Sequence, residues 1–98
     1  MYARVSFYDM AGASRDDAVR GFEGALAALE EMQGNQGGLL LVNPDGGKAI
    51  TITLWESEEA LRTSEEQANQ MREQAAGSAG VTISSVEPYE VALEFGPR

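Results

Sequence analysis

Two segments of the chain alternate apolar and polar side chains with a period of two, which is typical of β-strands that bury one face. Residues 2–9 read YARVSFYD and residues 48–55 read KAITITLW. A short aliphatic run, LLLV, occupies residues 39–42, and the sequence NPDGG separates it from the strand at 48–55. Asn, Pro, Asp and Gly favour turn conformations, so we expect these two neighbouring strands to form a hairpin.

Helical periodicity occupies the segments between these strands. Apolar residues recur at steps of three and four between Val19 and Met32, which predicts a helix from a cap at Ser14 to about residue 33. A second helix is expected from a cap at Ser57 to about residue 76, with a thin buried stripe. The members of that stripe are Ala60, Leu61, Ser64, Ala68, Met71 and Ala75. Both helices begin with acidic side chains, which suit a helix N-terminus.

The last part of the chain predicts a strand at residues 81–87, an interruption at Pro88 and a further strand at 89–95. Proline confines that junction to a sheet edge or a bend. The resulting order is strand, helix, strand, strand, helix, strand. This βαββαβ order predicts an α+β, ferredoxin-like fold. No linker, repeat or low-complexity tract divides the chain, so we expect one domain over residues 1–98.

The two faces of the expected sheet differ in polarity, and in this topology the helices cover only one of them. We expect the apolar set to meet the helices, namely Val5, Phe7, Ile50, Ile52, Leu54, Val81 and Ile83. The opposite face then holds Arg4, Ser6, Tyr8, Thr51, Thr53, Trp55, Thr82 and Ser84. Residues 39–42 form an edge strand that is apolar on both sides, which is an aggregation hazard unless something covers it. We therefore expect a homodimer, packed sheet against sheet, that buries Trp55 and encloses a chamber lined by hydroxyls and aromatic rings.

Charge and composition exclude several kinds of partner. The chain has 16 Asp and Glu against 7 Lys and Arg, a formal net charge of −9. Nucleic acid and anionic membranes are therefore poor partners. The absence of Cys and His removes disulfides, thiolate nucleophiles and most zinc or haem ligation, so we expect neither a metal nor a cofactor. We see no signal peptide and no apolar run of membrane-spanning length, and we expect a cytoplasmic protein.

Three stretches give the chain a resemblance to a known family. They are the Gly-rich turn into residues 39–42, the hairpin at 43–47 and the stretch LWESEEAL at 54–61. On these residues the chain resembles the antibiotic biosynthesis monooxygenase-like family. The resemblance implies a dimeric α/β barrel in which two ferredoxin-like subunits join their sheets. That family includes cofactor-independent quinone-forming oxygenases, haem-degrading enzymes and isomerase-like proteins.

The functional residues of the family match this chain only in part. Trp55 stands where the family has a Trp at the end of its third strand. Haem-degrading members also carry an axial His on the following helix, whereas this chain has no His. The quinone-forming members carry an Asn where this chain has Thr51, and a helical Tyr where it has Leu61.

Seven side chains are candidate ligand contacts: Arg4, Ser6, Tyr8, Thr51, Thr53, Trp55 and Met71. Trp55 either stacks on a flat aromatic ligand or only fills a sheet–sheet interface. Arg4 either neutralises a bound enolate or carboxylate or pairs with one of the many acids. Tyr8 and Ser6 either orient a ligand or bond across strands. Met71 is equally suited to filling a gap in the core.

No residue is a convincing general base near neutral pH, so no catalytic residue is assigned. The leading hypothesis, which rests on the resemblance, is a cofactor-independent monooxygenase-like protein. It would act on or bind a small, planar, aromatic or polyketide-like molecule in the barrel cavity. The alternative is a non-enzymatic module for small-molecule binding or dimerisation.

Overall fold

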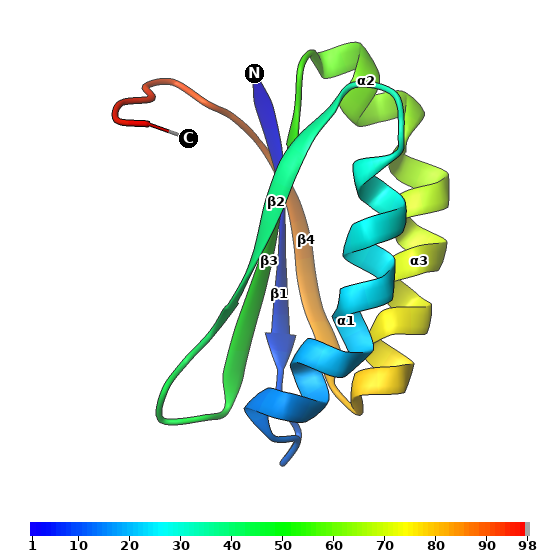
Figure 1. The fold of residues 1–98 in the computed structure, drawn as a ribbon, viewed down its shortest axis with the longest axis vertical. Coiled ribbons are helices and arrows are strands. Elements are labelled where there is room, and N and C mark those ends of the chain that lie inside the picture. The colour runs from blue at the N-terminus through cyan, green and yellow to red at the C-terminus, as the bar shows by residue number, and fades with distance from the viewer. Residues whose placement is uncertain (98) are drawn as a thin grey trace.

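The computed structural model describes residues 1–97, which form four strands and three helices (Figure 1). In chain order the elements are β1 (Tyr2–Asp9), α1 (Arg15–Glu30), β2 (Asn35–Val42), β3 (Lys48–Trp55), α2 (Glu58–Thr63), α3 (Glu65–Ala79) and β4 (Thr82–Glu90). The expected order of elements is confirmed, except that the second helix is divided into α2 and α3. Within residues 1–97, no helix has the length and apolar character needed to cross a bilayer.

The four strands form one antiparallel sheet in the order β2-β3-β1-β4. The helices lie along one face of this sheet and leave the other face uncovered (Figure 1). The α+β, ferredoxin-like fold is therefore confirmed. So are the hairpin of β2 and β3 and the edge position of the aliphatic strand.

Capping residues explain where the helices begin. The Ser14 hydroxyl accepts a hydrogen bond from the Asp17 amide at 3.1 Å, and the Asp17 carboxylate accepts one from the Ser14 amide at 3.0 Å. This reciprocal capping box satisfies two otherwise unpaired amides at the start of α1. The Ser57 hydroxyl caps α2 in a similar way, accepting from the Ala60 amide at 3.1 Å.

The second helix differs from the expectation in its middle and at its end. It is interrupted at Ser64, where the Leu61 carbonyl accepts hydrogen bonds from the Ser64 hydroxyl and from Arg4. Such side-chain bonds compete with the helical ladder. The helix then continues past residue 76 to Ala79, and Gly80 ends it in the left-handed conformation with φ of 76°. Glycine adopts that conformation without a steric penalty.

The expected sidedness of the two central strands is wrong. The polar set on β1 and β3 faces the helices and is buried, namely Arg4, Ser6, Tyr8, Thr51, Thr53 and Trp55. The apolar set on the same strands is only half-buried and lies on the uncovered face, namely Val5, Phe7, Ile50, Ile52 and Leu54. Val81 and Ile83 do meet the helices, as expected. The alternation predicted two faces correctly, but it could not say which face the helices cover.

Small residues allow the helices to pack closely. The core joins Tyr8 and Phe22, whose ring centroids lie 4.9 Å apart, to the alanines of α3. A Cβ added to Gly21 of α1 would lie 2.5 Å from the Cβ of Ala79. This contact needs a glycine because a larger residue would push α1 away from α3.

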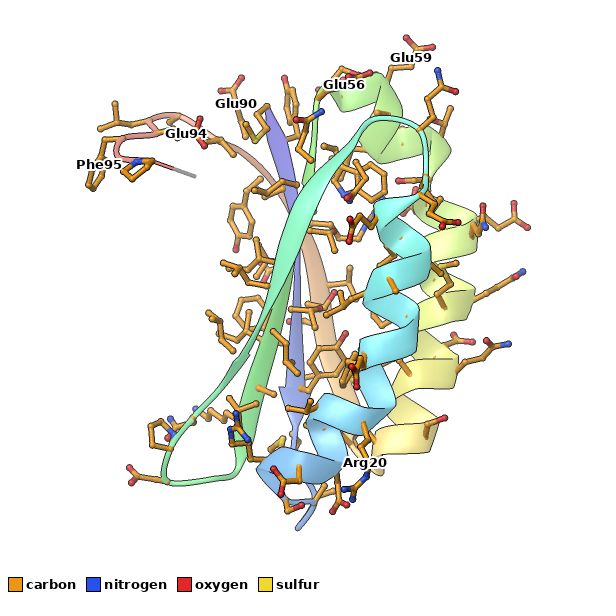
Figure 2. All side chains as sticks on the ribbon, viewed as in Figure 1. Arg20, Glu56, Glu59, Glu90, Glu94 and Phe95 are labelled. Carbon is orange, nitrogen blue, oxygen red and sulfur yellow. The ribbon has the colours of Figure 1, made fainter. Side chains whose placement is uncertain are left out.

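The end of the chain also differs from the expectation. β4 passes through Pro88 and ends at Glu90, so residues 91–95 are not a strand. β4 is an edge strand, the position in a sheet where proline is tolerated. Beyond it the chain leaves the body of the fold, and Leu93 and Phe95 are strongly exposed (Figure 2).

Candidate functional site

A polar layer lies between the sheet and the helices. Arg4, Ser6 and Tyr8 of β1 alternate with outward-facing residues, and so do Thr51, Thr53 and Trp55 of β3. The register pairs Ser6 with Thr51 and Arg4 with Thr53, so the two rows lie side by side. A sheet face packed under helices is normally apolar. A buried row of hydroxyls and a guanidinium is therefore the feature of this fold that most needs a functional explanation.

The aromatic residues of this layer have hydrogen-bond partners within the chain. The Tyr8 hydroxyl shares a hydrogen bond of 3.1 Å with the Thr51 hydroxyl. The indole N–H of Trp55 donates to the Thr53 hydroxyl at 3.0 Å. Trp55 is 0% exposed in a single chain. The expectation that a second subunit is needed to bury it is therefore wrong, because the helices and the sheet of one chain already do so.

Arg4 is held firmly and yet is incompletely satisfied. Its Nη2 donates to the Leu61 carbonyl at 2.5 Å and to the Ser64 hydroxyl at 3.2 Å. Its guanidinium carbon lies 5.4 Å from the ring centroid of Trp55, within the range of a cation–π contact. The side chain is 6% exposed, and Nη1 is buried with no hydrogen-bond partner among the described residues. Burial lowers the pKa of Arg4, and the nearby cation of Arg72 lowers it further.

Arg72 of α3 is a second cation in the same layer. Its Nη1 donates to the Asn69 side chain at 2.6 Å. Burial lowers the pKa of Arg72, while Tyr8 and, more weakly, the carboxylates of Glu73 and Glu65 oppose that effect. Because a guanidinium stays protonated in proteins, both side chains are cations at neutral pH.

Among residues 1–97, neither of these two arginines has a carboxylate partner within salt-bridge distance. The ion pairs found in residues 1–97 join Arg15 to Asp16, Arg20 to Asp17 and Arg62 to Glu58, all on the surface. In a chain of net charge −9, carboxylates are plentiful. The inner layer therefore concentrates positive charge in a protein that is acidic elsewhere.

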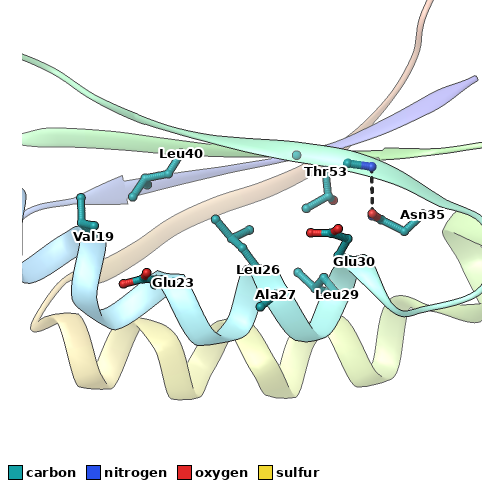
Figure 3. Close-up of a pocket in the computed structure, with 11 residues that line it drawn as sticks. Val19, Glu23, Leu26, Ala27, Leu29, Glu30, Asn35, Leu40 and Thr53 are labelled. Atoms are coloured by element: carbon teal, nitrogen blue, oxygen red, sulfur yellow. Dashed lines mark hydrogen bonds between the residues drawn. The ribbon is translucent and has the colours of Figure 1, made fainter. Parts of the chain in front are cut away.

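Two cavities border this layer, a small inner pocket and a larger open groove. The inner pocket has a volume of about 20 Å³ and is lined by Arg4, Ser6, Tyr8, Thr51 and Thr53 together with residues of α1 and α3, Arg72 among them. A groove of about 450 Å³ opens between α1 and β2 (Figure 3). Leu26, Leu29 and Thr53 line both spaces. These three side chains form the boundary between the open groove and the polar interior.

The groove has an apolar floor and an acidic rim. Its wall on β2 includes Leu40, Gly37 and Gly38, and its wall on α1 includes Glu23 and Glu30, whose side chains are labelled in Figure 3. The Asn35 side chain accepts a hydrogen bond from the Gly37 amide at 2.8 Å, drawn as the dashed line in Figure 3. The same side chain donates to the Leu54 carbonyl at 3.3 Å, which fixes the end of β2 against β3.

The structure brings together most of the side chains that the sequence pointed to. Five of them line the inner pocket: Arg4, Ser6, Tyr8, Thr51 and Thr53. Trp55 lies against Arg4, and Met71 is partly buried but lines neither the pocket nor the groove. The residue that faces the pocket is its neighbour Arg72.

Sequence reasoning missed Arg72 and the whole wall that α1 contributes. The helical stripe runs through Ala68, Arg72 and Ala75, at steps of four and three, and this spacing could have revealed the arginine. An expected apolar stripe led instead to Met71. No signal in the sequence alone places α1 residues such as Leu26 opposite a polar sheet face.

Comparison with known proteins gives a consistent result for the fold. No protein-family profile matches the chain. Two curated proteins of Mycobacterium tuberculosis are each 37% identical over 67 residues: uncharacterized protein Rv2557 of strain H37Rv and uncharacterized protein MT2634 of strain CDC 1551. The match covers 68% of this chain, which spans only 30% of the length of either relative.

The solved structures match over almost the full chain. SnoaB, a cofactor-independent oxygenase from Streptomyces nogalater, superposes in a mutant form with a TM-score of 0.77 at 14% identity, covering 98% of this chain and 97% of that one. A provisionally assigned antibiotic biosynthesis monooxygenase from Deinococcus radiodurans gives a TM-score of 0.71 at 16% identity, with coverage of 100% and 99%. The haem degrader MhuD of Mycobacterium tuberculosis gives a TM-score of 0.69 at 20% identity, covering 98% of this chain and 100% of MhuD. The chain therefore has the antibiotic biosynthesis monooxygenase-like fold.

Proposed function

We propose that this chain binds a small planar molecule in the groove between α1 and β2 and acts on it as a cofactor-independent monooxygenase. The observation that carries the proposal is the groove of about 450 Å³ whose inner wall is shared with a buried polar layer. This volume lies in the range of small-molecule sites, which combine apolar walls with a few placed polar groups. The likeness to SnoaB in fold supports the reaction type.

The residues of the inner layer suit a substrate that becomes an anion during oxygenation. In such a reaction a CH₂ group between two rings reacts with O₂ to give a C=O group and water, and the substrate itself supplies the electrons. Loss of a CH₂ proton to solvent water gives an enolate, which the cations of Arg4 and Arg72 would stabilise. Trp55 would act indirectly, because the Arg4 guanidinium lies over its ring.

The test is binding and turnover with a defined probe, 1,8-dihydroxyanthrone. We expect the probe to raise the melting temperature and oxygen uptake to accompany its conversion to the quinone. Ala27 is an exposed residue of the groove, and the variant Ala27→Phe should abolish both the rise in melting temperature and the oxygen uptake. Gln74→Phe, an equally exposed change on α3 outside both cavities, is the control. No shift with this probe or its quinone in the unaltered chain would contradict the proposal.

A second candidate function is binding without chemistry. The inner pocket offers hydroxyls and guanidinium groups but no His or carboxylate to accept a proton near neutral pH. A chain that binds the anthrone in the groove but consumes no oxygen would be a binding module. The oxygen electrode therefore separates the two functions, while the thermal shift supports both.

Haem degradation does not fit these residues, although MhuD shares the fold. The chain contains no His and no Cys to serve as an axial ligand. The Tyr8 hydroxyl is already bonded to Thr51, and the space beside it is about 20 Å³. The proposed reaction therefore contains no step through a haem.

We further propose that the working unit is a homodimer, formed through the uncovered face of the sheet. Val5, Phe7, Ile50, Ile52 and Leu54 are half-buried there, and the neighbouring edge residues Leu39 and Leu41 are 56% and 44% exposed. A continuous apolar sheet face of this kind marks a protein–protein contact more often than a free surface. The dimer expected from the sequence thus keeps its packing through the uncovered sheet face, but the apolar set lines that face in place of the polar set, and the ligand site lies inside each subunit.

Analytical ultracentrifugation tests the dimer. We expect the unaltered chain to sediment as a dimer at micromolar concentration and Ile52→Lys, at the centre of the uncovered face, to sediment as a monomer. Gln70→Lys places the same charge on the exposed side of α3 and should leave the dimer intact. A monomer in the unaltered chain would contradict the proposed assembly and would leave the ligand site untouched.

A further inference from the structure

We propose that the natural ligand of this site is an organic monoanion, a carboxylate on a planar body, whose charged head enters the inner pocket between Arg4 and Arg72. The inference rests on the proposed binding function and deepens it by naming the chemical class of the ligand. It follows from three independent features of the site, which are its unpaired charge, its fixed geometry and its division into a small and a large space.

The charge of the inner layer needs a counterion. Arg4 is almost fully buried and Arg72 half-buried, and neither forms a salt bridge with any described residue. Removing a guanidinium from water without a compensating anion is costly. Glu65 acts on both cations, but from an exposed position and without an ion pair. A bound anion would supply the missing partner.

The two cations are held in place before any ligand arrives. Hydrogen bonds to Leu61 and Ser64, and the ring of Trp55, fix Arg4 and leave its Nη1 without a partner among the described residues. Nη1 of Arg72 donates to Asn69, and the Tyr8 hydroxyl also interacts with this guanidinium, so the unpartnered nitrogen is that of Arg4. A planar guanidinium with free N–H groups matches the geometry of a carboxylate. Preorganised donors of this kind bind with little further loss of side-chain freedom.

The sizes of the two spaces divide the ligand into a head and a body. A pocket of about 20 Å³ accommodates one atom the size of a water molecule, such as a carboxylate oxygen, but not a ring. The adjoining groove of about 450 Å³ is large enough for the rings. Leu26, Leu29 and Thr53 border both spaces, and the proposed ligand passes its head between these three side chains.

The rim of the groove sets the direction of the ligand. Glu23 and Glu30 are exposed and line the groove from α1 (Figure 3). Both arginines line the inner pocket instead. The two carboxylates repel an anionic group left at the rim, while the inner cations attract it. A single carboxylate therefore points inward, and a second carboxylate at the far end of the body is disfavoured.

Isothermal titration calorimetry with matched probes tests the inference. The probes are 2-naphthoate, its neutral isostere 2-naphthamide, and naphthalene-2,6-dicarboxylate. We expect the unaltered chain to bind the naphthoate at least about tenfold more tightly than the amide or the dicarboxylate, since a charged hydrogen bond contributes about that much. Arg4→Gln and Arg72→Gln should each weaken naphthoate binding about 10- to 100-fold and leave amide binding nearly unchanged. Arg62→Gln removes a surface arginine paired with Glu58 and should change neither the affinity for naphthoate nor that for naphthamide.

The outcomes separate this inference from the function on which it rests. Equal affinity for naphthoate and naphthamide, or naphthoate binding that survives both arginine changes, would overturn the anionic ligand and leave planar-ligand binding intact. Absence of binding by all three probes and by the anthrone would overturn both. If Arg4→Gln fails to fold, naphthoate binding by Arg72→Gln alone tests the inference. Arg72 is only half-buried, so this variant should fold, and its circular dichroism spectrum verifies that it does.

Discussion

Replacing Gly21 with alanine should destabilise the chain, because α1 approaches the backbone of α3 closely at this glycine. A Cβ built at Gly21 would lie 2.5 Å from the Cβ of Ala79 and 2.7 Å from its Cα and its amide nitrogen. Two of these three atoms belong to the backbone of α3, so no side-chain rotation can relieve the clash. The helices would have to separate to admit one methyl group.

Two opposing effects set how far Gly21→Ala lowers the free energy of unfolding. Alanine is better than glycine in a helix interior by about 1 kcal/mol. Overpacking a tight contact costs about 1–3 kcal/mol, and the upper part of that range applies where the opposing atoms are backbone. We therefore expect Gly21→Ala to lower the free energy of unfolding by about 1–2 kcal/mol. In a domain of this size that corresponds to a melting temperature lower by roughly 4–16 °C.

Gly24 provides the matched control, since it lies in the same helix one turn further on. A Cβ there meets nothing within 4 Å, and the position is exposed. Gly24→Ala should therefore raise the free energy of unfolding by up to about 1 kcal/mol. The two alanine variants should therefore change the free energy of unfolding in opposite directions, although the chemical change is identical.

Urea denaturation followed by circular dichroism measures both variants. Equal stability of Gly21→Ala and Gly24→Ala would show that the backbones of α1 and α3 are not in tight contact at Gly21. The contact also has a functional consequence. α1 carries Leu26 and Leu29 and α3 carries Arg72 over the same pocket, so separating the helices should weaken ligand binding in Gly21→Ala alone.

Two further predictions concern charge. Arg4→Met should leave the free energy of unfolding of the ligand-free chain unchanged or raise it by up to about 2 kcal/mol. The reason is that removing an uncompensated buried cation offsets the loss of its hydrogen bonds. A clear loss of stability in thermal melts would make Arg4 a structural residue. Hydrogen bonds from Ser14 lower the pKa of Asp17 below its ordinary value of 3.8. The ionised carboxylate therefore stabilises the fold at pH values above 3.8, and this contribution is lost as the pH falls through the lowered value in the folded state. The difference in free energy of unfolding between the unaltered chain and Asp17→Asn should be present at neutral pH and shrink in acid. An undiminished difference in urea titrations at acidic pH would contradict the stabilising role of the ionised Asp17 carboxylate.

The order of the elements was predictable because local chemistry determines it. The capping serines, the NPDGG turn and the alternating strands each specify their own backbone with little help from tertiary contacts. The end of the second helix was not predictable in this way. The helix was expected to end at about residue 76, but it continues through Gly77 to Ala79, and packing against α1 stabilises that last turn.

The face of the sheet that the helices cover could not be read from the alternation. A period of two gives two faces, and hydrophobicity normally assigns the apolar one to the core. Here both faces are buried or half-buried, and the polar one lies under the helices. Arg, Tyr and Trp on the same face, opposite helices rich in alanine, were the available signal. These small helical residues leave room beside the sheet that long polar side chains fill.

The candidate site was predicted in its composition but not in its place. Arg4, Ser6, Tyr8, Thr51 and Thr53 do gather around one cavity. They were expected between two subunits and instead lie within one. The groove on α1 and the second cation on α3 depend on how the helices rotate over the sheet, which only the packed structure determines.

Arginine side-chain NMR detects whether an anionic ligand meets Arg4 and Arg72 inside a single subunit. In a titration of the ¹⁵N-labelled chain with 2-naphthoate, the Nε–Hε resonances of Arg4 and Arg72 should shift together. Those of the surface arginines Arg15, Arg20 and Arg62 should stay in place. Saturable shifts at the surface arginines, with Arg4 and Arg72 unmoved, would contradict the account.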